Sequence, residues 1–225
     1  AHADDGRVLY FKRPSTPQNP GEAIVTGLRD MCAELDIDPR AIHRLCHGTT
    51  VATNALIQRR GGKVAMITTE GFRDLLEIGR QTRPHMYSLQ QDHPKPLVPR
   101  DRRFEVTERI DAGGTAITPL DEDTVAKALE LAGQSGADAC AICGLFSFLN
   151  DSHERRIGEM ARARFPQMRV SLSSQVRPEF REYERFSTTV LNAYLQSVMG
   201  DYLDFLETKL NDVAPTTPVR IYQSS

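Results

Sequence analysis

The fold is decided by residues 120–173, which read LDEDTVAKALELAGQSGADACAICGLFSFLNDSHERRIGEMARARFPQMRVSLS. Hydrophobic spacing predicts helices over residues 121–132 and 152–164, and apolar runs predict strands over residues 139–146 and 169–173. Helices that alternate with strands in this way form the crossovers of a parallel sheet. The sequence therefore predicts an α/β fold.

The segments on either side extend this pattern. Residues 63–68, KVAMIT, are densely apolar and predict a buried strand, and residues 104–110, FEVTERI, alternate as a strand does. A short helix is expected over residues 72–78, and a last strand begins near residue 218. Residues 185–210 predict one long helix, because apolar side chains recur on a single stripe made of Phe186, Val190, Tyr194, Met199, Leu203, Leu206 and Leu210.

The N-terminal part has its own expected elements. A strand is expected over residues 6–13, and a helix after Asn19, which suits an N-cap and is followed by proline. A short strand over residues 41–46 then leads into a helix over residues 51–60. The glycine pair at residues 61–62 is expected to end that helix.

Composition and charge exclude several classes of protein. The 28 basic residues are balanced by 30 acidic ones, so neither nucleic acid nor an acidic membrane surface is an expected partner. The longest apolar stretch, residues 137–148, is too short to span a bilayer, and no segment has the pattern of an export signal. Cys140 and Cys143 lie inside that stretch. Buried thiols of a cytoplasmic protein are therefore expected, rather than a zinc or redox pair.

The most informative polar stretch is residues 47–54, HGTTVATN, where a predicted strand ends and a helix begins. A helix start presents free backbone N–H groups and the positive end of the helix dipole, so it can bind an anion. Gly48 would form the tight turn before the helix. The hydroxyls of Thr49, Thr50 and Thr53 and the amide of Asn54 would add donors for a phosphate or a polarised carbonyl. The alternative is that Thr49 or Thr50 caps the helix, which contributes ~1 kcal/mol. One cap leaves three polar groups unexplained.

Other chemistry has weaker support in the sequence. A threonine nucleophile would need a base and an oxyanion hole, and the sequence assigns neither. His43 and His47 are four residues apart but lack the glutamate of HExxH, so a metal site is not expected there. His85, Asp92 and His93 share the long loop of residues 80–102 and could meet a metal or a substrate, with a solvated loop as the alternative.

Charged residues supply a second set of candidates. Arg80, Gln81 and Arg83 follow the short helix, and arginines bind carboxylates or phosphates bidentately. A solvated loop is again the alternative. Ion pairs are the simplest interpretation of Glu108 and Arg109, and of Glu182, Glu184 and Arg185. Exposed ion pairs contribute little, so these residues are of interest only if the fold buries them.

Four stretches together resemble the hydantoinase A/5-oxoprolinase family. They are HGTTVATNALIQRRGGKVAMITTEGFRDLLEIGRQTRP (47–84), KPLVPRDRRFEVTERID (95–111), NDSHERRI (150–157) and VRPEFREYERFSTTVLNAYL (176–195). That family includes ATP-dependent N-methylhydantoinases, 5-oxoprolinases and the related subunits of acetone and acetophenone carboxylases.

The resemblance implies a fold and a chemistry. The fold would be an RNase H-like α/β domain of the actin, Hsp70 and sugar-kinase type, with an inserted α/β subdomain. Residues 1–175 would be the family's N-terminal region, and residues 176–225 the start of its core domain. ATP would phosphorylate a cyclic amide or a ketone, with Mg²⁺ on its phosphates. A hydantoinase B-type subunit or domain is the implied partner.

The resemblance also implies roles for the candidate residues. Thr50, Thr53 and Asn54 would be catalytic, and the implied phosphate- or substrate-binding residues are Gly48, Thr49, Arg80, Gln81 and Arg83. The family's glycine-rich phosphate loop, DxGGTFTD, and its second RNase H-like domain have no counterpart in residues 1–225. The chain is therefore expected to be truncated at both ends and inactive by itself.

The predicted function is the N-terminal part of an ATP-dependent hydrolase that opens a five-membered cyclic amide, either hydantoin or 5-oxoproline. One alternative is a subunit of an ATP-dependent acetone or acetophenone carboxylase, which would require bicarbonate. The other is a non-catalytic scaffold that docks a partner through the long helix. In that case the apolar stripe of the helix would be exposed.

Overall fold

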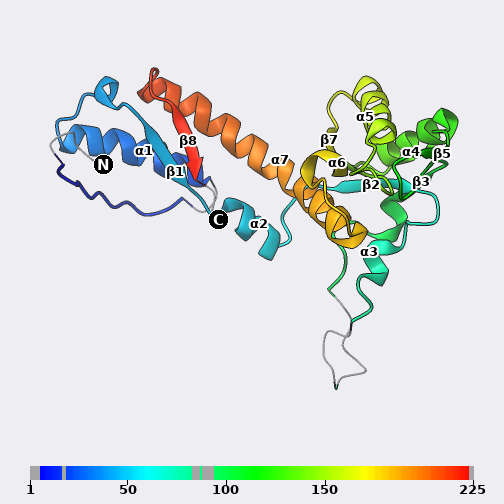
Figure 1. The fold of residues 1–225 in the computed structure, drawn as a ribbon. Helices are drawn as coiled ribbons and strands as arrows, with labels where there is room; N and C mark the ends of the chain where they lie inside the picture. The colour runs from blue at the N-terminus through cyan, green and yellow to red at the C-terminus, as the bar shows by residue number, and fades with distance from the viewer. Residues whose placement is uncertain (1–5, 17–18, 83–86, 88–93, 223–225) are drawn as a thin grey trace. The chain divides into compact units, whose positions relative to one another are not determined.

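The structure is a computed structural model that describes residues 6–16, 19–82, 87 and 94–222. The chain divides into two compact units (Figure 1). Unit 1 comprises residues 1–58 and 198–225, and unit 2 comprises residues 59–197. Unit 2 is therefore inserted into unit 1 along the chain, and the predicted α/β fold with an inserted α/β subdomain is confirmed.

Unit 2 is built on a four-stranded parallel sheet, as residues 120–173 predict. Its strands lie in the order β3-β2-β6-β7 and are β2 (Val64–Thr69), β3 (Arg103–Val106), β6 (Ala139–Cys143) and β7 (Arg169–Leu172). All residues of β2 and β6 are buried. This fits their apolar sequences, because the central strands of a parallel sheet are covered on both faces.

Helices pack on the sheet of unit 2 (Figure 1). Helices α4 (Glu122–Gln134) and α5 (Ser152–Arg164) share one apolar core with the sheet, formed mainly by Ile67, Val106, Val125, Leu129, Cys140, Ile142, Ile157 and Leu172. The Asp121 carboxylate begins α4 by accepting hydrogen bonds from the backbone N–H groups of Asp123 and Thr124, at 2.9 and 3.4 Å. The remaining helical elements of unit 2 are α3 (Leu75–Ile78), η2 (Arg100–Arg102), α6 (Ser173–Val176) and residues 182–197 of α7 (Glu182–Val213).

The strand predicted over residues 104–110 is divided in two. β3 ends at Val106, and the next strand, β4 (Arg109–Ile110), pairs antiparallel with β5 (Ala116–Thr118) as a separate hairpin. The break occurs because the Thr107 N–H donates to the Thr124 hydroxyl at the start of α4, at 3.1 Å, and not to a neighbouring strand. Glu108 follows at this break and is buried.

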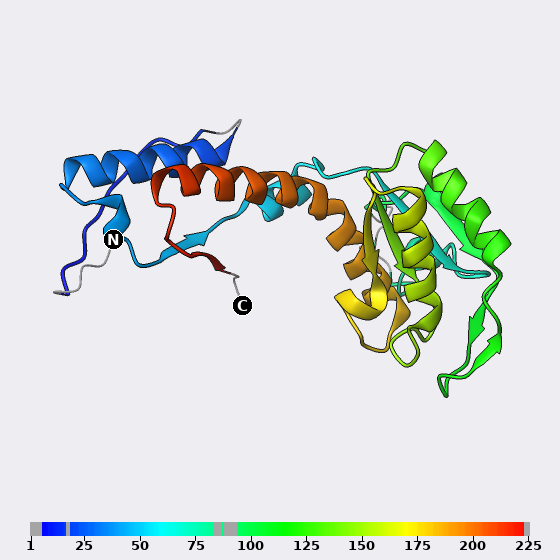
Figure 2. The same cartoon turned by 90° about the horizontal axis from the view of Figure 1, so that it is seen from above.

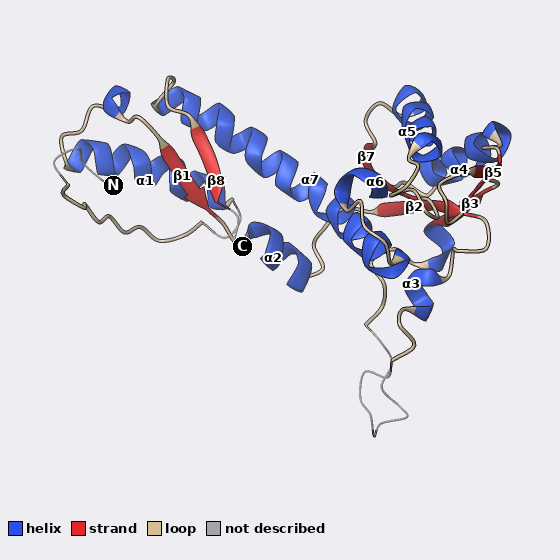
Figure 3. Cartoon of the chain, in the orientation of Figure 1, coloured by secondary structure: helices blue, strands red, loops and turns tan. Residues whose placement is uncertain are grey.

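Unit 1 contains α1 (Pro20–Glu34), η1 (Pro39–Ala41), β1 (Leu45–Gly48), α2 (Val51–Ile57), β8 (Val219–Tyr222) and residues 198–213 of α7. Strands β1 and β8 pair in parallel, with Leu45 opposite Val219. Helix α1 lies beside the second half of α7 (Figure 2), and Figure 3 shows the strands β1 and β8 of the same unit in red. Their contact forms a small core of Val25, Leu28, Cys32, Leu206 and Leu210.

Three local predictions for unit 1 were wrong. Residues 6–13 form no strand, and only Val8 makes an isolated bridge. The helix predicted over residues 51–60 ends at Ile57, because the chain turns at Arg59, whose φ is 54°, before it reaches the glycine pair. The strand predicted over residues 41–46 begins only at Leu45. Asn19 does occupy the N-cap of α1 and is followed by proline, as predicted, but its side chain makes no capping bond. The Thr16 hydroxyl accepts from the Ala23 N–H instead, at 3.1 Å.

The prediction that Cys140 and Cys143 are buried thiols is confirmed. Three residues apart on β6, their side chains point to opposite faces of the sheet, so they cannot form a redox pair. Burial raises the pKa of Cys140 to about 12 and that of Cys143 well above its ordinary value. None of the helices in the described ranges combines the length and apolarity that crossing a membrane requires.

Candidate functional site

The threonine turn, defined as Gly48 to Asn54, joins β1 to α2 in unit 1. Gly48 is the last residue of β1, and a Cβ added there would meet no atom within 4 Å. The glycine is therefore not explained by crowding among the described residues. Gly48, Thr50, Thr53 and Asn54 are exposed, and Thr49 is half-buried. The turn presents its polar groups on the surface of unit 1.

Helix capping accounts for part of this turn. The Thr49 hydroxyl accepts from the Val51 N–H at 3.2 Å, so Thr49 is bonded at the helix start. Thr50 occupies the N-cap position without a side-chain capping bond, and its hydroxyl accepts from the Asn54 amide at 3.3 Å. In the described part of the chain, the Thr53 hydroxyl has no hydrogen-bond partner. Capping thus explains Thr49 and leaves Thr50, Thr53 and Asn54 available to a ligand.

A histidine and a tyrosine lie beside the turn. His47 Nε2 is 2.6 Å from the hydroxyl of Tyr202, a buried residue of α7. Burial lowers the pKa of His47. Burial also raises the pKa of Tyr202, partly offset by a hydrogen bond with Thr49. From the sequence, His47 was predicted not to be a metal ligand, and its partner Tyr202 is 155 residues away in the chain, so no local pattern connects the two.

The second predicted set, Arg80, Gln81 and Arg83, belongs to unit 2, and Arg83 lies outside the described residues. Arg80 is paired with Glu184 at the start of α7, so its guanidinium is already bound to a carboxylate. Burial raises the pKa of Glu184, but hydrogen bonds from Arg80 and from the backbone outweigh it and lower the pKa. Gln81 is exposed and has a φ of 56°, which is uncommon for a residue other than glycine.

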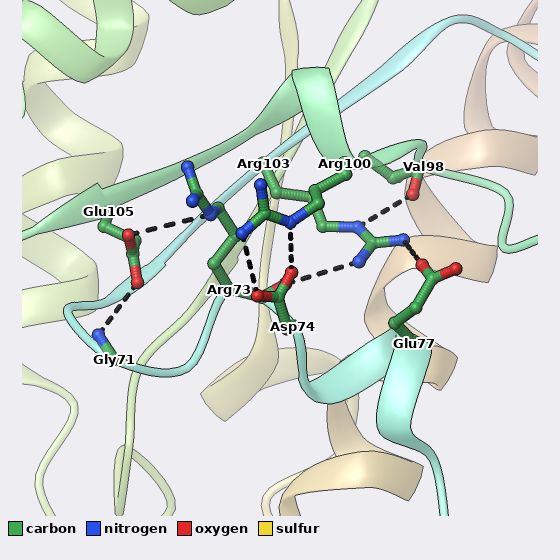
Figure 4. Close-up of polar contacts among 8 residues, drawn as sticks. All are labelled: Gly71, Arg73, Asp74, Glu77, Val98, Arg100, Arg103 and Glu105. Carbon is green, nitrogen blue, oxygen red and sulfur yellow. Dashed lines mark hydrogen bonds and ion pairs between the residues drawn. The ribbon is translucent and has the colours of Figure 1, made fainter.

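An ion-pair cluster holds α3, which precedes these residues (Figure 4). The Arg103 guanidinium is buried and donates to the Glu77 carboxylate at 2.8 Å and to the Val98 carbonyl at 2.9 Å. Arg100 binds Asp74 bidentately, at 2.7 and 3.0 Å. The hydrogen bond from Arg100 lowers the pKa of Asp74. These contacts attach α3 to β3 and so position the chain that continues to Arg80.

A third group of polar residues, which was not predicted from the sequence, lies at the carboxyl edge of the unit 2 sheet. Thr69 ends β2, Glu108 follows β3, and His153 lies in the first turn of α5. The Thr69 hydroxyl donates to Glu108 Oε1, and His153 Nδ1 is 2.7 Å from Glu108 Oε2. The predicted ion pair between Glu108 and Arg109 is not formed. Arg109 donates to the Glu70 carbonyl and lies over the Phe72 ring.

A network of hydrogen-bonded charged residues, centred on Arg185, lies beside the group formed by Thr69, Glu108 and His153. The Arg185 guanidinium is fully buried and donates to the Gly144 carbonyl, the Ser173 hydroxyl and the Glu179 carbonyl, at 2.8, 3.1 and 3.0 Å. The buried Glu154 carboxylate accepts from the Ser173 hydroxyl and from two backbone N–H groups, those of Gly144 and Ser174. Every nitrogen of the guanidinium and both carboxylate oxygens have partners, so this network joins the loops after β6 and β7 to α7.

The predicted residues therefore form two groups. The threonine turn belongs to unit 1, while Arg80 and Gln81 belong to unit 2. In the described ranges no three His, Cys, Asp or Glu side chains are arranged to hold a metal ion. The predicted metal candidates His85, Asp92 and His93 fall outside those ranges. The stretches FEVTERI and NDSHERRI, which hold Glu108 and His153, were both among those that resemble the family, but neither indicated that the two side chains meet.

Comparison with known proteins gives consistent similarities. The family model of the hydantoinase/oxoprolinase N-terminal region matches residues 1–165. Caprolactamase subunit alpha of Pseudomonas jessenii is 38% identical over 98% of this chain and 32% of its own length. The crystal structure of the ATP-dependent caprolactamase from that organism superposes with a TM-score of 0.90 at 36% identity, over 99% of this chain and 33% of that chain.

Two further relatives have different named activities. Acetophenone carboxylase gamma subunit of Aromatoleum aromaticum is 32% identical over 87% of this chain and 29% of its own length. The 5-oxoprolinase of Saccharomyces cerevisiae is 30% identical over 92% of this chain and 19% of its own length. The chain thus spans about a third or less of the length of the relatives it matches.

Proposed function

Because the chain belongs to the hydantoinase/oxoprolinase family, we propose that it is part of an ATP-dependent hydrolase that opens a cyclic amide by phosphoryl activation. The similarity to caprolactamase subunit alpha, which extends over 98% of the chain, is the observation that carries this proposal. The likeness to a 5-oxoprolinase supports the same class of substrate. Hydantoin and 5-oxoproline remain the five-membered substrates that the sequence predicts, and the caprolactamase adds caprolactam as a substrate to test.

The threonine turn supplies the groups that such a reaction needs at a phosphate. Thr50, Thr53 and Asn54 are neutral donors, and hydrogen bonds from preorganised donors stabilise the charge that develops on a transferring phosphoryl group. The open space over Gly48 lets a ligand approach the backbone closely. The turn contains no carboxylate, so ligands for the Mg²⁺ that would accompany ATP would have to come from elsewhere in the protein.

The second set has a supporting role in this proposal. Arg80, Gln81 and Arg83 would bind the substrate or a phosphate, and Arg80 would first have to exchange its pairing with Glu184. Since half of the Arg80 side chain is exposed, that exchange costs little. We assign the complete enzyme to the cytoplasm, with a hydantoinase B-type subunit or domain as its partner. The relatives that are named as subunits support the existence of a partner subunit.

A ketone carboxylase is the second candidate function, and the likeness to the acetophenone carboxylase gamma subunit favours it. The scaffold alternative required an exposed stripe on the long helix. In α7, however, most of that stripe is buried and the rest is half-buried: Phe186, Val190, Tyr194, Leu206 and Leu210 are buried, and Met199 and Leu203 are half-buried. The stripe is packed within the units, which argues against docking through this helix.

The test is ATP hydrolysis by the full-length gene product together with its partner subunit. The substrates are 5-oxoproline, hydantoin, caprolactam, and acetone with and without bicarbonate. ATP turnover that depends on a cyclic amide and yields the ring-opened product would support the hydrolase. Turnover only with acetone plus bicarbonate would replace it with the carboxylase. Absence of coupled turnover with all of them would contradict both.

A further inference from the structure

The residues on the two sides of Gly48 differ from it in burial. Successive side chains of an extended chain point to opposite sides, so His47 and Thr49 share one side of the chain, and Gly48 lies on the other. His47 and Thr49 are half-buried, whereas Gly48 and the following Thr50 are exposed. The threonine turn therefore has an inner side, which faces the interior of unit 1, and an outer side that a ligand can reach.

A single phenol, that of Tyr202, bonds to the residues on both sides of Gly48. Tyr202 is buried and belongs to the part of α7 that lies in unit 1, as does the whole turn. Its hydroxyl oxygen is 2.6 Å from His47 Nε2, and the two rings are tilted against each other with centroids 6.0 Å apart. The same hydroxyl shares a hydrogen bond with Thr49. One side chain of α7 thus anchors the inner side of the turn at two points.

The protonation of these groups fixes the direction of each hydrogen bond. Burial lowers the pKa of His47 and raises that of Tyr202, so at neutral pH the imidazole is neutral and the phenol keeps its proton. The phenol therefore donates to Nε2, and the imidazole proton is on Nδ1. The bond with Thr49 lowers the pKa of Tyr202, which is the effect of a donor to the phenol oxygen. Thr49 is thus the donor, and its oxygen accepts from the Val51 N–H at 3.2 Å.

The hydroxyl of Tyr202 has a use that packing does not explain. A phenylalanine would fill the same space in unit 1, but it would leave His47 Nε2 without its donor and Thr49 without its acceptor. Gly48 itself is open, since a Cβ added there would meet no atom within 4 Å, and glycine has more backbone freedom than any other residue. Two anchored neighbours restrict that freedom and hold the outer side of the turn in one conformation.

We propose that Tyr202, acting through His47 and Thr49, positions the threonine turn so that the Gly48 backbone and the Thr50 hydroxyl face a phosphate of the nucleotide. The nature of this ligand rests on the proposed function. Donors that are held in place before the reaction stabilise a transferring phosphoryl group better than donors that must first be ordered. Tyr202 and His47 do not touch the phosphate in this scheme, so they are positioning residues.

The first experiment measures kcat of the full-length protein with its partner, using whichever cyclic amide it turns over, at a temperature where every variant is folded. We expect Tyr202→Phe and His47→Leu to lower kcat at least about 10-fold, because small displacements of positioned groups slow the reaction strongly. His47→Gln is the conservative variant. Its amide reaches the place of Nε2 and can accept the same hydrogen bond, so it should keep kcat within about twofold of the wild type.

Two controls separate positioning from stability. Tyr10→Phe removes the hydroxyl of a tyrosine of unit 1 that is 89% exposed. Val25→Ala removes buried methyl groups from the small core between α1 and α7, so it destabilises unit 1 without touching the turn. Both should keep the wild-type kcat. The inference would be overturned by wild-type kcat in Tyr202→Phe, by equal losses in His47→Gln and His47→Leu, or by an equal loss in Val25→Ala. None of these results would affect the proposed hydrolase.

The second experiment does not depend on turnover. Hydrogen exchange of backbone amides reports local opening, so peptides of the full-length protein that cover residues 45–54 should exchange at least about five-fold faster in Tyr202→Phe. The same peptides should exchange at the wild-type rate in Tyr10→Phe. Unchanged exchange in Tyr202→Phe would overturn the inference whatever the kinetics show. Faster exchange in a protein that turns over no cyclic amide would support the anchoring of the turn and contradict the proposed function.

Discussion

The Arg185 network of unit 2 and the threonine turn of unit 1 hold their polar groups in opposite ways. In the network, a fully buried guanidinium and a buried carboxylate have every polar atom bonded, mostly to backbone atoms of the loops after β6 and β7. In the turn, Thr50, Thr53 and Asn54 are exposed, and the Thr53 hydroxyl has no partner among the described residues.

This difference predicts which substitutions change the stability of the protein and which change its activity. A buried and fully bonded charge leaves no atom for a ligand, and removing one member exposes the other to a strong desolvation penalty. An exposed hydroxyl contributes little to folding and can still bind a phosphate. Substitutions in the network should therefore change the free energy of unfolding, and substitutions in the turn should change turnover.

The largest effect is expected from Arg185→Met. This change leaves the Glu154 carboxylate buried without its neighbouring positive charge, so we expect the free energy of unfolding to fall by about 3–5 kcal/mol. Arg156→Met is the matched control. It removes a bidentate pair with Glu122 in which both side chains are about half exposed, and it should cost less than about 1 kcal/mol. Urea unfolding measures both, and equal losses would contradict the comparison.

The next effect concerns the turn. In the full-length enzyme, Thr50→Ala and Thr53→Ala should lower kcat at least about 10-fold, because each removes a donor to the transferring phosphoryl group. The melting temperature should change little, since neither hydroxyl caps α2. Thr208→Ala, at an exposed position on α7 whose hydroxyl bonds only the Asp204 carbonyl, is the control. If the two variants lost about 1 kcal/mol of stability and kept full activity, capping would be the role of these threonines.

The contrast between the regions also explains what the sequence could predict. Residues 121–173 carry local periods of helix and strand, so α4, β6, α5 and β7 appear within a few residues of their predicted bounds. β6 ends at Cys143, earlier than predicted, because the backbone N–H and carbonyl of Gly144 bond to Glu154 and Arg185 and not to a neighbouring strand.

Pairings between distant residues left no such local signal. Glu108 and His153 are 45 residues apart, and His47 and Tyr202 are 155 apart. Glutamate, histidine and tyrosine are also common in solvent-exposed segments, so only the fold shows that the members of each pair are in contact. The threonine turn itself was predicted, since its hydroxyls lie within seven residues. Its assignment to catalysis stays a prediction, as do the roles of Arg80, Gln81 and Arg83 and the division of the chain near residue 175.

A smaller effect is expected at the start of α4. Asp121→Ala removes the acceptor for two backbone N–H groups, and we expect a loss of ~1 kcal/mol in the free energy of unfolding. Asp123→Ala changes a neighbouring exposed carboxylate in the first turn that has no capping role, so it should lose less. Urea unfolding of the two variants tests whether the side-chain cap or only the negative charge stabilises this helix.

The smallest expected effect depends on pH and concerns His47. Burial lowers the pKa of His47 in the folded state below its ordinary value of 6.5, so the unfolded chain binds more protons as the pH falls through that value. Stability should therefore decrease as the pH falls from about 7.5 to about 5, with His47 contributing less than about 1 kcal/mol. His47→Gln should reduce this slope, while His43→Gln, at an exposed position in the same unit, should keep it. Identical slopes in both variants would show that the imidazole beside Tyr202 is no more desolvated than an exposed histidine, and the turn would then be as open at His47 as it is at Thr53.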